Sequence, residues 1–96
     1  MTDPLIGTAR ATGQILNSNA AVLTIEFHAR STNSGSVTVG MSDVASNNGR
    51  EIPPGESWVF NCSLPDIGAS RGSVLMSKFY AQMTGADSLD YAAIVR

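Results

Sequence analysis

Residues 21–30 read Ala-Val-Leu-Thr-Ile-Glu-Phe-His-Ala-Arg, and this stretch decides the fold class. Apolar and polar side chains alternate along it, and a period of two is typical of a β-strand with one buried face. The apolar set, which we predict to face the core, consists of Leu23, Ile25, Phe27 and Ala29. The other set, which we predict to face water or a partner protein, consists of Val22, Thr24, Glu26, His28 and Arg30. This second set is the candidate interface.

The same alternation recurs at residues 37–41, 58–62 and 89–95. In the last stretch one face carries Leu89, Tyr91, Ala93 and Val95, while Ala92 and Ile94 point the other way. Turn residues recur about every ten positions, as they do in sandwiches and barrels. The sequence therefore predicts an all-β fold, either a compact antiparallel β-sandwich or a jelly-roll-like barrel, with six to eight short strands.

Several local predictions follow from turn chemistry. Residues 31–35 are turn formers between two alternating stretches, so we expect 21–30 and 37–41 to form a β-hairpin. Pro53-Pro54-Gly55 predicts a type II turn with positive φ at Gly55, next to a core residue at Ile52. Residues 73–83 fit a helix or a strand, and we favour a strand because aromatic residues suit a pleated surface.

The chain of 96 residues has room for one domain, spanning 1–96. Residues 1–16 contain two weak strand candidates. Alternatively, these residues form an extended N-terminal arm. No stretch of 18 apolar residues predicts a transmembrane helix, and the first residues lack the pattern of a signal peptide. We therefore expect the chain to be assembled in a reducing cytoplasm.

Charged residues make up 15% of the chain, and Lys78 is the single lysine among six basic residues. Binding to nucleic acid through phosphates needs clustered lysine and arginine, and so does a polybasic membrane anchor. We therefore expect neither a nucleic acid nor a membrane as partner.

Few residues are candidates for catalysis or metal binding. Cys62 is the single cysteine and His28 the single histidine, so neither a disulfide within the chain nor a cysteine-based zinc site is expected. Glu26 and His28 are neighbours on one strand face, either as a pH-sensitive or metal-binding pair or as part of a solvated or interface-facing strand. Nucleophile-elbow, phosphate-loop and dinucleotide glycine patterns are absent, so we predict no catalytic residue, no cofactor and no metal.

Trp58 admits two interpretations. It is either a platform for stacking a sugar ring, with Tyr80 or Tyr91 beside it, or a large core residue whose N–H is satisfied. Its exposure distinguishes two classes of function, because a glycan-binding module needs an exposed aromatic groove, whereas a structural protein is expected to bury these rings.

The segment VGMSDVASNNG at 39–49, followed by IPPGES at 52–57, resembles a recurrent pattern in small virion proteins of tailed bacteriophages. In that pattern a Val-Gly step, a Ser-Asn-Gly turn and a Pro-Gly-Glu-Ser turn lead into an aromatic stretch similar to residues 78–81. The resemblance covers roughly residues 20–96. The sequence departs from the pattern at Met76 and Met83, and in a longer apolar stretch after Cys62. It implies a compact β-sandwich used in phage heads, fibres or decoration proteins.

From this resemblance we expect a non-enzymatic virion structural protein, namely a capsid decoration (cement) protein. It would act as a homo-oligomer such as a trimer, bind the major capsid protein, and be assembled in the host cytoplasm. The alternative is a fibre or baseplate module that recognises host-surface glycan. A small hydrolase is the third, least favoured interpretation.

Overall fold

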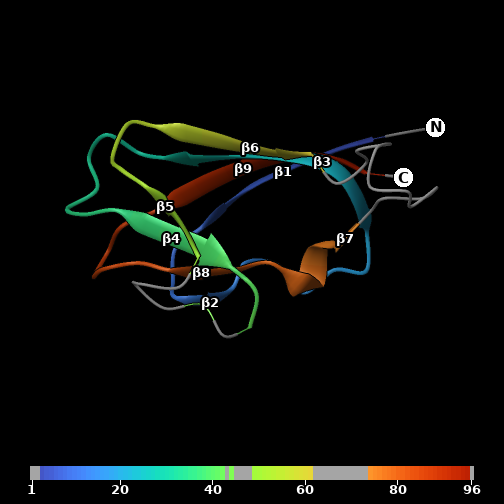
Figure 1. Ribbon diagram of the computed structural model, residues 1–96, viewed down its shortest axis with the longest axis horizontal. Coiled ribbons are helices and arrows are strands. Elements are labelled where there is room, and N and C mark those ends of the chain that lie inside the picture. The colour runs from blue at the N-terminus through green and yellow to red at the C-terminus, as the bar shows by residue number, and fades with distance from the viewer. Residues whose placement is uncertain (1–2, 43, 45–48, 62–73, 96) are drawn as a thin grey trace.

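The computed structural model describes residues 3–42, 44, 49–61 and 74–95 of the chain. Within these residues nine strands form two antiparallel sheets that pack face to face (Figure 1), so the predicted all-β sandwich is confirmed. In the same part of the chain, no helix has the length and hydropathy that a membrane crossing requires.

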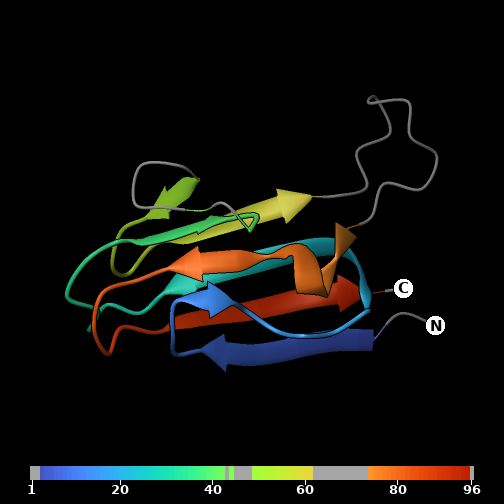
Figure 2. The ribbon, with the colours of Figure 1, turned by 90° about the horizontal axis from the view of Figure 1, so that it is seen from below.

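The first sheet has the strand order β1-β9-β3-β6. Its strands are β1 (Asp3–Ala9), β9 (Leu89–Val95), β3 (Ala21–Ala29) and β6 (Ser57–Asn61), and the short β7 (Val74–Leu75) pairs with the start of β3. β1 lies along β9 for its full length, from Asp3 opposite Val95 to Ala9 opposite Leu89 (Figure 2). The two ends of the chain therefore form one continuous ladder.

The second sheet has the order β2-β8-β4-β5. Its strands are β2 (Gly13–Gln14), β8 (Tyr80–Gln82), β4 (Val37–Gly40) and β5 (Arg50–Ile52), with a 3₁₀ turn at Met76–Lys78 just before β8. Residues 3–16 do not form an extended arm but supply an edge strand to each sheet. β1 pairs with β9, and β2 pairs with β8.

The core lies between the sheets. Along β9 the predicted faces are confirmed, because Leu89, Tyr91 and Ala93 are buried whereas Ala92 and Ile94 are exposed. Four aromatic rings meet in this core, with neighbouring centroids 5.4–6.0 Å apart: Phe27, Trp58, Phe60 and Phe79.

The predicted hairpin between residues 21–30 and 37–41 is wrong, because β3 and β4 belong to different sheets. Residues 31–35 cross from one sheet to the other, held by the carboxylate of Asp87. That carboxylate accepts hydrogen bonds from the backbone N–H groups of Ser34 and Gly35, at 2.7 and 3.1 Å. Either arrangement would bury the apolar faces of both strands, so the alternation alone did not distinguish them.

Residues 74–83 follow the strand prediction only in their second half. Phe79, Ala81 and Met83 alternate and are buried, as expected for a strand. Before them the 3₁₀ turn changes the periodicity, so that Met76 is fully buried while Leu75 is exposed. A 3₁₀ turn has three residues per turn and therefore breaks the two-residue alternation.

The turn at residues 53–56 is confirmed. Gly55 has φ +84°, the N–H of Glu56 donates to the carbonyl of Pro53 at 3.0 Å, and Ile52 is buried at the end of β5. Met41, the last residue of the alternating stretch 37–41, lies beyond the end of β4 and is exposed. Cys62 and the apolar stretch that follows it lie outside the described residues.

Candidate functional site

The outer face of the first sheet, which points away from the second sheet, gathers side chains from four strands. Register places them in three rows that run from β1 across β9 and β3 to β6. The middle row is Ile6, Ala92, Glu26 and Val59. The row nearest the 31–35 connection is Thr8, Asp90, His28 and Ser57. The third row includes Ile94, Thr24 and Asn61.

Three of the five candidate interface residues lie on this outer face, namely Thr24, Glu26 and His28. Arg30 follows β3 directly and reaches back to the same face. Val22 was wrongly placed there, because its side chain is fully buried. The pairing of β3 with β9 shifts by one residue between Val22 and Thr24, and such an irregularity turns the preceding side chain to the opposite face.

A polar network occupies one end of the outer face. The guanidinium of Arg30 donates two hydrogen bonds to the carboxylate of Asp90, each 3.0 Å long, and the hydroxyl of Thr8 donates a third at 2.7 Å. The bond from Arg30 is the main reason that the pKa of Asp90 is lowered, against the opposing effect of desolvation, and Thr8 adds to the lowering. Asp90 in turn raises the pKa of Arg30. The two charges therefore form a partly exposed ion pair.

His28 shares a 2.8 Å hydrogen bond with Ser57, between Nδ1 and Oγ. A serine and a histidine at this distance have the contact of a nucleophile and its general base. The third member of a hydrolytic triad would be a carboxylate bonded to the histidine. Asp90 lies beside His28 in the register, but its carboxylate accepts hydrogen bonds from Arg30 and Thr8. The pair is therefore arranged as a surface hydrogen bond rather than as a triad.

Aliphatic side chains dominate the rest of the outer face. Ile6 is 73% exposed, Val59 60% and Ile94 42%, and these are three of the five large hydrophobic residues that the described chain exposes. The solvent side of an antiparallel sheet is ordinarily polar. Three exposed apolar side chains therefore make this face more apolar than the solvent side of such a sheet ordinarily is.

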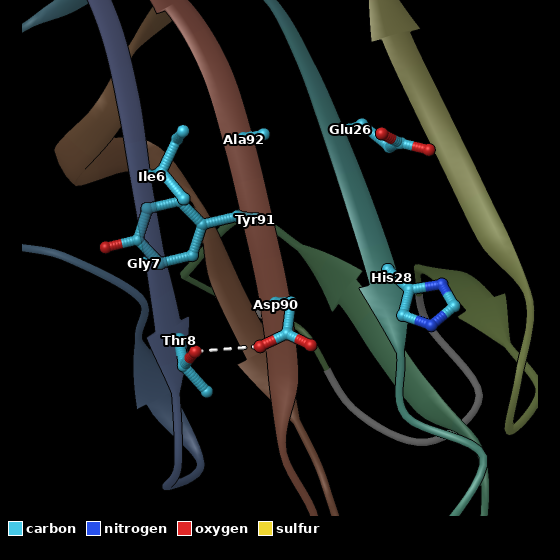
Figure 3. Close-up of a pocket in the computed structure, with 8 residues that line it drawn as sticks. All are labelled: Ile6, Gly7, Thr8, Glu26, His28, Asp90, Tyr91 and Ala92. Atoms are coloured by element: carbon cyan, nitrogen blue, oxygen red, sulfur yellow. Dashed lines mark hydrogen bonds between the residues drawn. The ribbon is translucent and has the colours of Figure 1, made fainter.

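A shallow hollow of about 260 Å³ lies on this face, over β1, β9 and β3 (Figure 3). Ile6 and Glu26 stand on either side of the small Ala92, and Thr8, Asp90 and His28 form its polar end. The hollow exists because the central strand carries alanine between two longer side chains.

Of the aromatic residues that the sugar-platform interpretation names, Tyr91 lines the hollow, whereas Trp58 does not. The ring of Trp58 lies 5.9 Å from that of Phe27, on the inner side of β6, and the guanidinium of Arg50 covers it at 5.6 Å. Tyr91 is 7% exposed and its ring lies against Gly7. Trp58 is therefore partly buried and packs against the core, a position that favours the core interpretation over the sugar-platform interpretation.

No group of three histidine, cysteine or carboxylate side chains comes together as a metal site among the described residues. The proposed pairing of Glu26 with His28 is a shared face without a hydrogen bond between them.

Comparisons with family models, with curated proteins and with solved structures give no match. The function is therefore inferred from the residues of this chain.

The sequence predicted the outward orientation of part of this face. The alternation of β3 and β9 correctly placed Glu26, His28, Ala92 and Ile94. Ile6 lies in a weakly patterned strand, and nothing in the sequence indicated that the predicted strand 89–95 would bring Asp90 to this face beside Arg30.

Proposed function

We propose that this protein is a non-enzymatic structural protein that docks the outer face of its first sheet against another protein subunit. The observation that carries the proposal is the gathering of Ile6, Val59 and Ile94, all exposed, on that one face. A rim of charged and hydrogen-bonding groups beside an apolar centre is the composition of protein–protein interfaces.

The resemblance of residues 39–57 to small phage virion proteins narrows the proposal to a capsid decoration protein of a tailed bacteriophage. In this role the chain is assembled in the host cytoplasm, becomes part of the virion, and binds the major capsid protein. A standard interface buries roughly 800 Å² of each partner, so a single contact from a domain of this size holds weakly. A homo-oligomer such as a trimer strengthens attachment, because each later contact forms at high effective concentration.

The glycan-binding alternative receives no support from a particular contact. A glycan module exposes aromatic rings, whereas Trp58 packs beside Phe27 and under Arg50. Exposed aliphatic side chains serve a protein partner better than a hydroxyl-rich sugar.

Co-sedimentation with purified phage heads tests the proposal, together with light scattering of the free protein and its copy number in purified particles. We expect an oligomer at micromolar concentration, binding to heads, and a regular copy number per particle. A protein that ignores heads but binds a sugar array would replace the proposal with the fibre-module alternative.

A further inference from the structure

We infer that the hollow over β1, β9 and β3 receives an arginine side chain that the partner protein presents between aliphatic neighbours. This inference rests on the proposed docking function and adds the chemistry of the contact. It follows from the charges around the hollow, from its apolar floor, and from the position of the hollow within the exposed aliphatic patch.

Among the residues that line the hollow, Glu26 carries a charge that no neighbouring side chain compensates. Its side chain is exposed at the edge of the hollow, and the single ion pair found among the described residues joins Arg30 to Asp90. Arg30 is thus engaged with Asp90 at the polar end of the hollow, and Nδ1 of His28 is bonded to Ser57. A basic group entering the hollow would find the unpaired carboxylate of Glu26 on the β3 side, whereas the carboxylate of Asp90 at the polar end is already paired with Arg30 (Figure 3).

The floor and the opposite wall suit the apolar stem of the same side chain. Ile6, Ala92 and Glu26 are direct cross-strand neighbours, so a stem lying over Ala92 contacts Ile6 while its charged head reaches Glu26. Arginine combines a methylene stem with a weakly hydrated, planar cation, and it is enriched at protein interfaces. Lysine carries a similar stem but a more strongly hydrated head.

The surroundings explain why the partner is a protein and why aliphatic neighbours are expected. Val59 lies beyond Glu26 in the same row, and Ile94 lies beside Ala92 in the next outward position of β9. An arginine seated at Glu26 therefore brings its own flanking residues onto exposed aliphatic side chains. This arrangement of an anchor surrounded by contacts that exclude water is characteristic of interface hot spots.

The test uses the full chain, labelled with ¹⁵N, and three blocked pentapeptides of sequence Ala-Val-X-Val-Ala in which X is arginine, lysine or glutamate. We expect the arginine peptide to shift the amide signals of Ile6, Glu26 and Ala92, the lysine peptide to bind more weakly, and the glutamate peptide to cause no shift there.

Glu26→Gln should weaken binding of the arginine peptide about fivefold, the effect of removing one partner of a solvent-accessible ion pair. Glu51→Gln is the matched control, because Glu51 is also exposed on a strand but lies in β5 of the second sheet; its binding should equal that of the wild type. Equal binding of the arginine and glutamate peptides, or an unchanged affinity in Glu26→Gln, would overturn the inference.

The two proposals can fail separately. If the protein binds phage heads through the outer face while Glu26→Gln leaves peptide binding unchanged, the docking function stands and the arginine anchor is wrong. If the peptide binds as expected but heads are ignored, the anchor stands and its partner is another protein.

Discussion

Two glycines provide a graded test of the backbone geometry. Gly55 has φ +84°, and an added Cβ would meet only Ser31, at 3.7 Å and beyond. Gly49 has φ +144°, and an added Cβ would lie 2.7 Å from the carbonyl oxygen of Val39 and 2.9 Å from a methyl carbon of Thr38. Gly55→Ala therefore introduces backbone strain alone, whereas Gly49→Ala adds a collision with the backbone of β4.

The expected magnitudes follow from these contacts. Backbone strain at either position costs about 1–3 kcal/mol of unfolding free energy. At Gly49 the backbone oxygen of Val39 belongs to a paired strand, so relieving the collision costs about 1–3 kcal/mol more. Gly35→Ala is the control, because Gly35 has no positive φ and an added Cβ meets nothing within 4 Å. Relief of unfolded-state entropy makes that variant neutral or slightly stabilising.

Urea unfolding at neutral pH measures the series, with thermal melting as a second readout. We expect the order Gly35→Ala, Gly55→Ala, Gly49→Ala from most to least stable. Each kcal/mol lowers Tm by about 4–8 °C in a domain of this size. Equal stability of Gly49→Ala and Gly35→Ala would refute the placement of residue 49 against β4.

Two further variants test the interior of the sandwich. Asp87→Asn should destabilise the protein at neutral pH, and the difference from wild type should shrink as pH falls. Hydrogen bonds, first from the backbone of Ser34, lower the pKa of Asp87, so its stabilising effect is present above the unfolded-state pKa and is lost as pH falls through the lower folded-state pKa. Urea midpoints at pH 7 and in acid measure this change, and a difference that grows in acid would contradict the assigned role. Phe27→Ala should cost about 3–5 kcal/mol, because its ring is fully buried between Trp58 and Phe79. The near-ultraviolet circular dichroism of Trp58 should weaken in that variant, and an unchanged urea midpoint would contradict the core packing.

The alternation of apolar residues predicted the strands better than their partners. In 25–29 and 89–95 every second side chain faces the core, so the buried positions predicted in these stretches were correct. Alternation does not say which strand lies alongside, and so β3 and β4 were assigned to one hairpin although they lie in opposite sheets. The contact that directs the chain between sheets joins Asp87 to Ser34, and no local pattern relates residues so far apart.

The candidate site was also predicted only in part, because the alternation does not show which strands are neighbours. Glu26 and His28 were expected on an outward face because they belong to the clearest strand. Ile6 and Val59 join them only through the pairing of β1 with β9 and of β6 with β3. Val22 was misplaced because an irregularity in pairing reverses a side chain without leaving a sign in the sequence.

The most direct test of the docking face compares surface variants in the co-sedimentation assay with phage heads. The double variant Ile6→Ser, Val59→Ser removes two exposed aliphatic side chains from the outer face, and Met41→Ser removes one from beyond β4 in the second sheet. All three positions are exposed, so folding should change little, which circular dichroism verifies. We predict that the double variant loses binding to heads and that Met41→Ser binds as wild type; a double variant that binds as tightly as the wild type would contradict docking through this face.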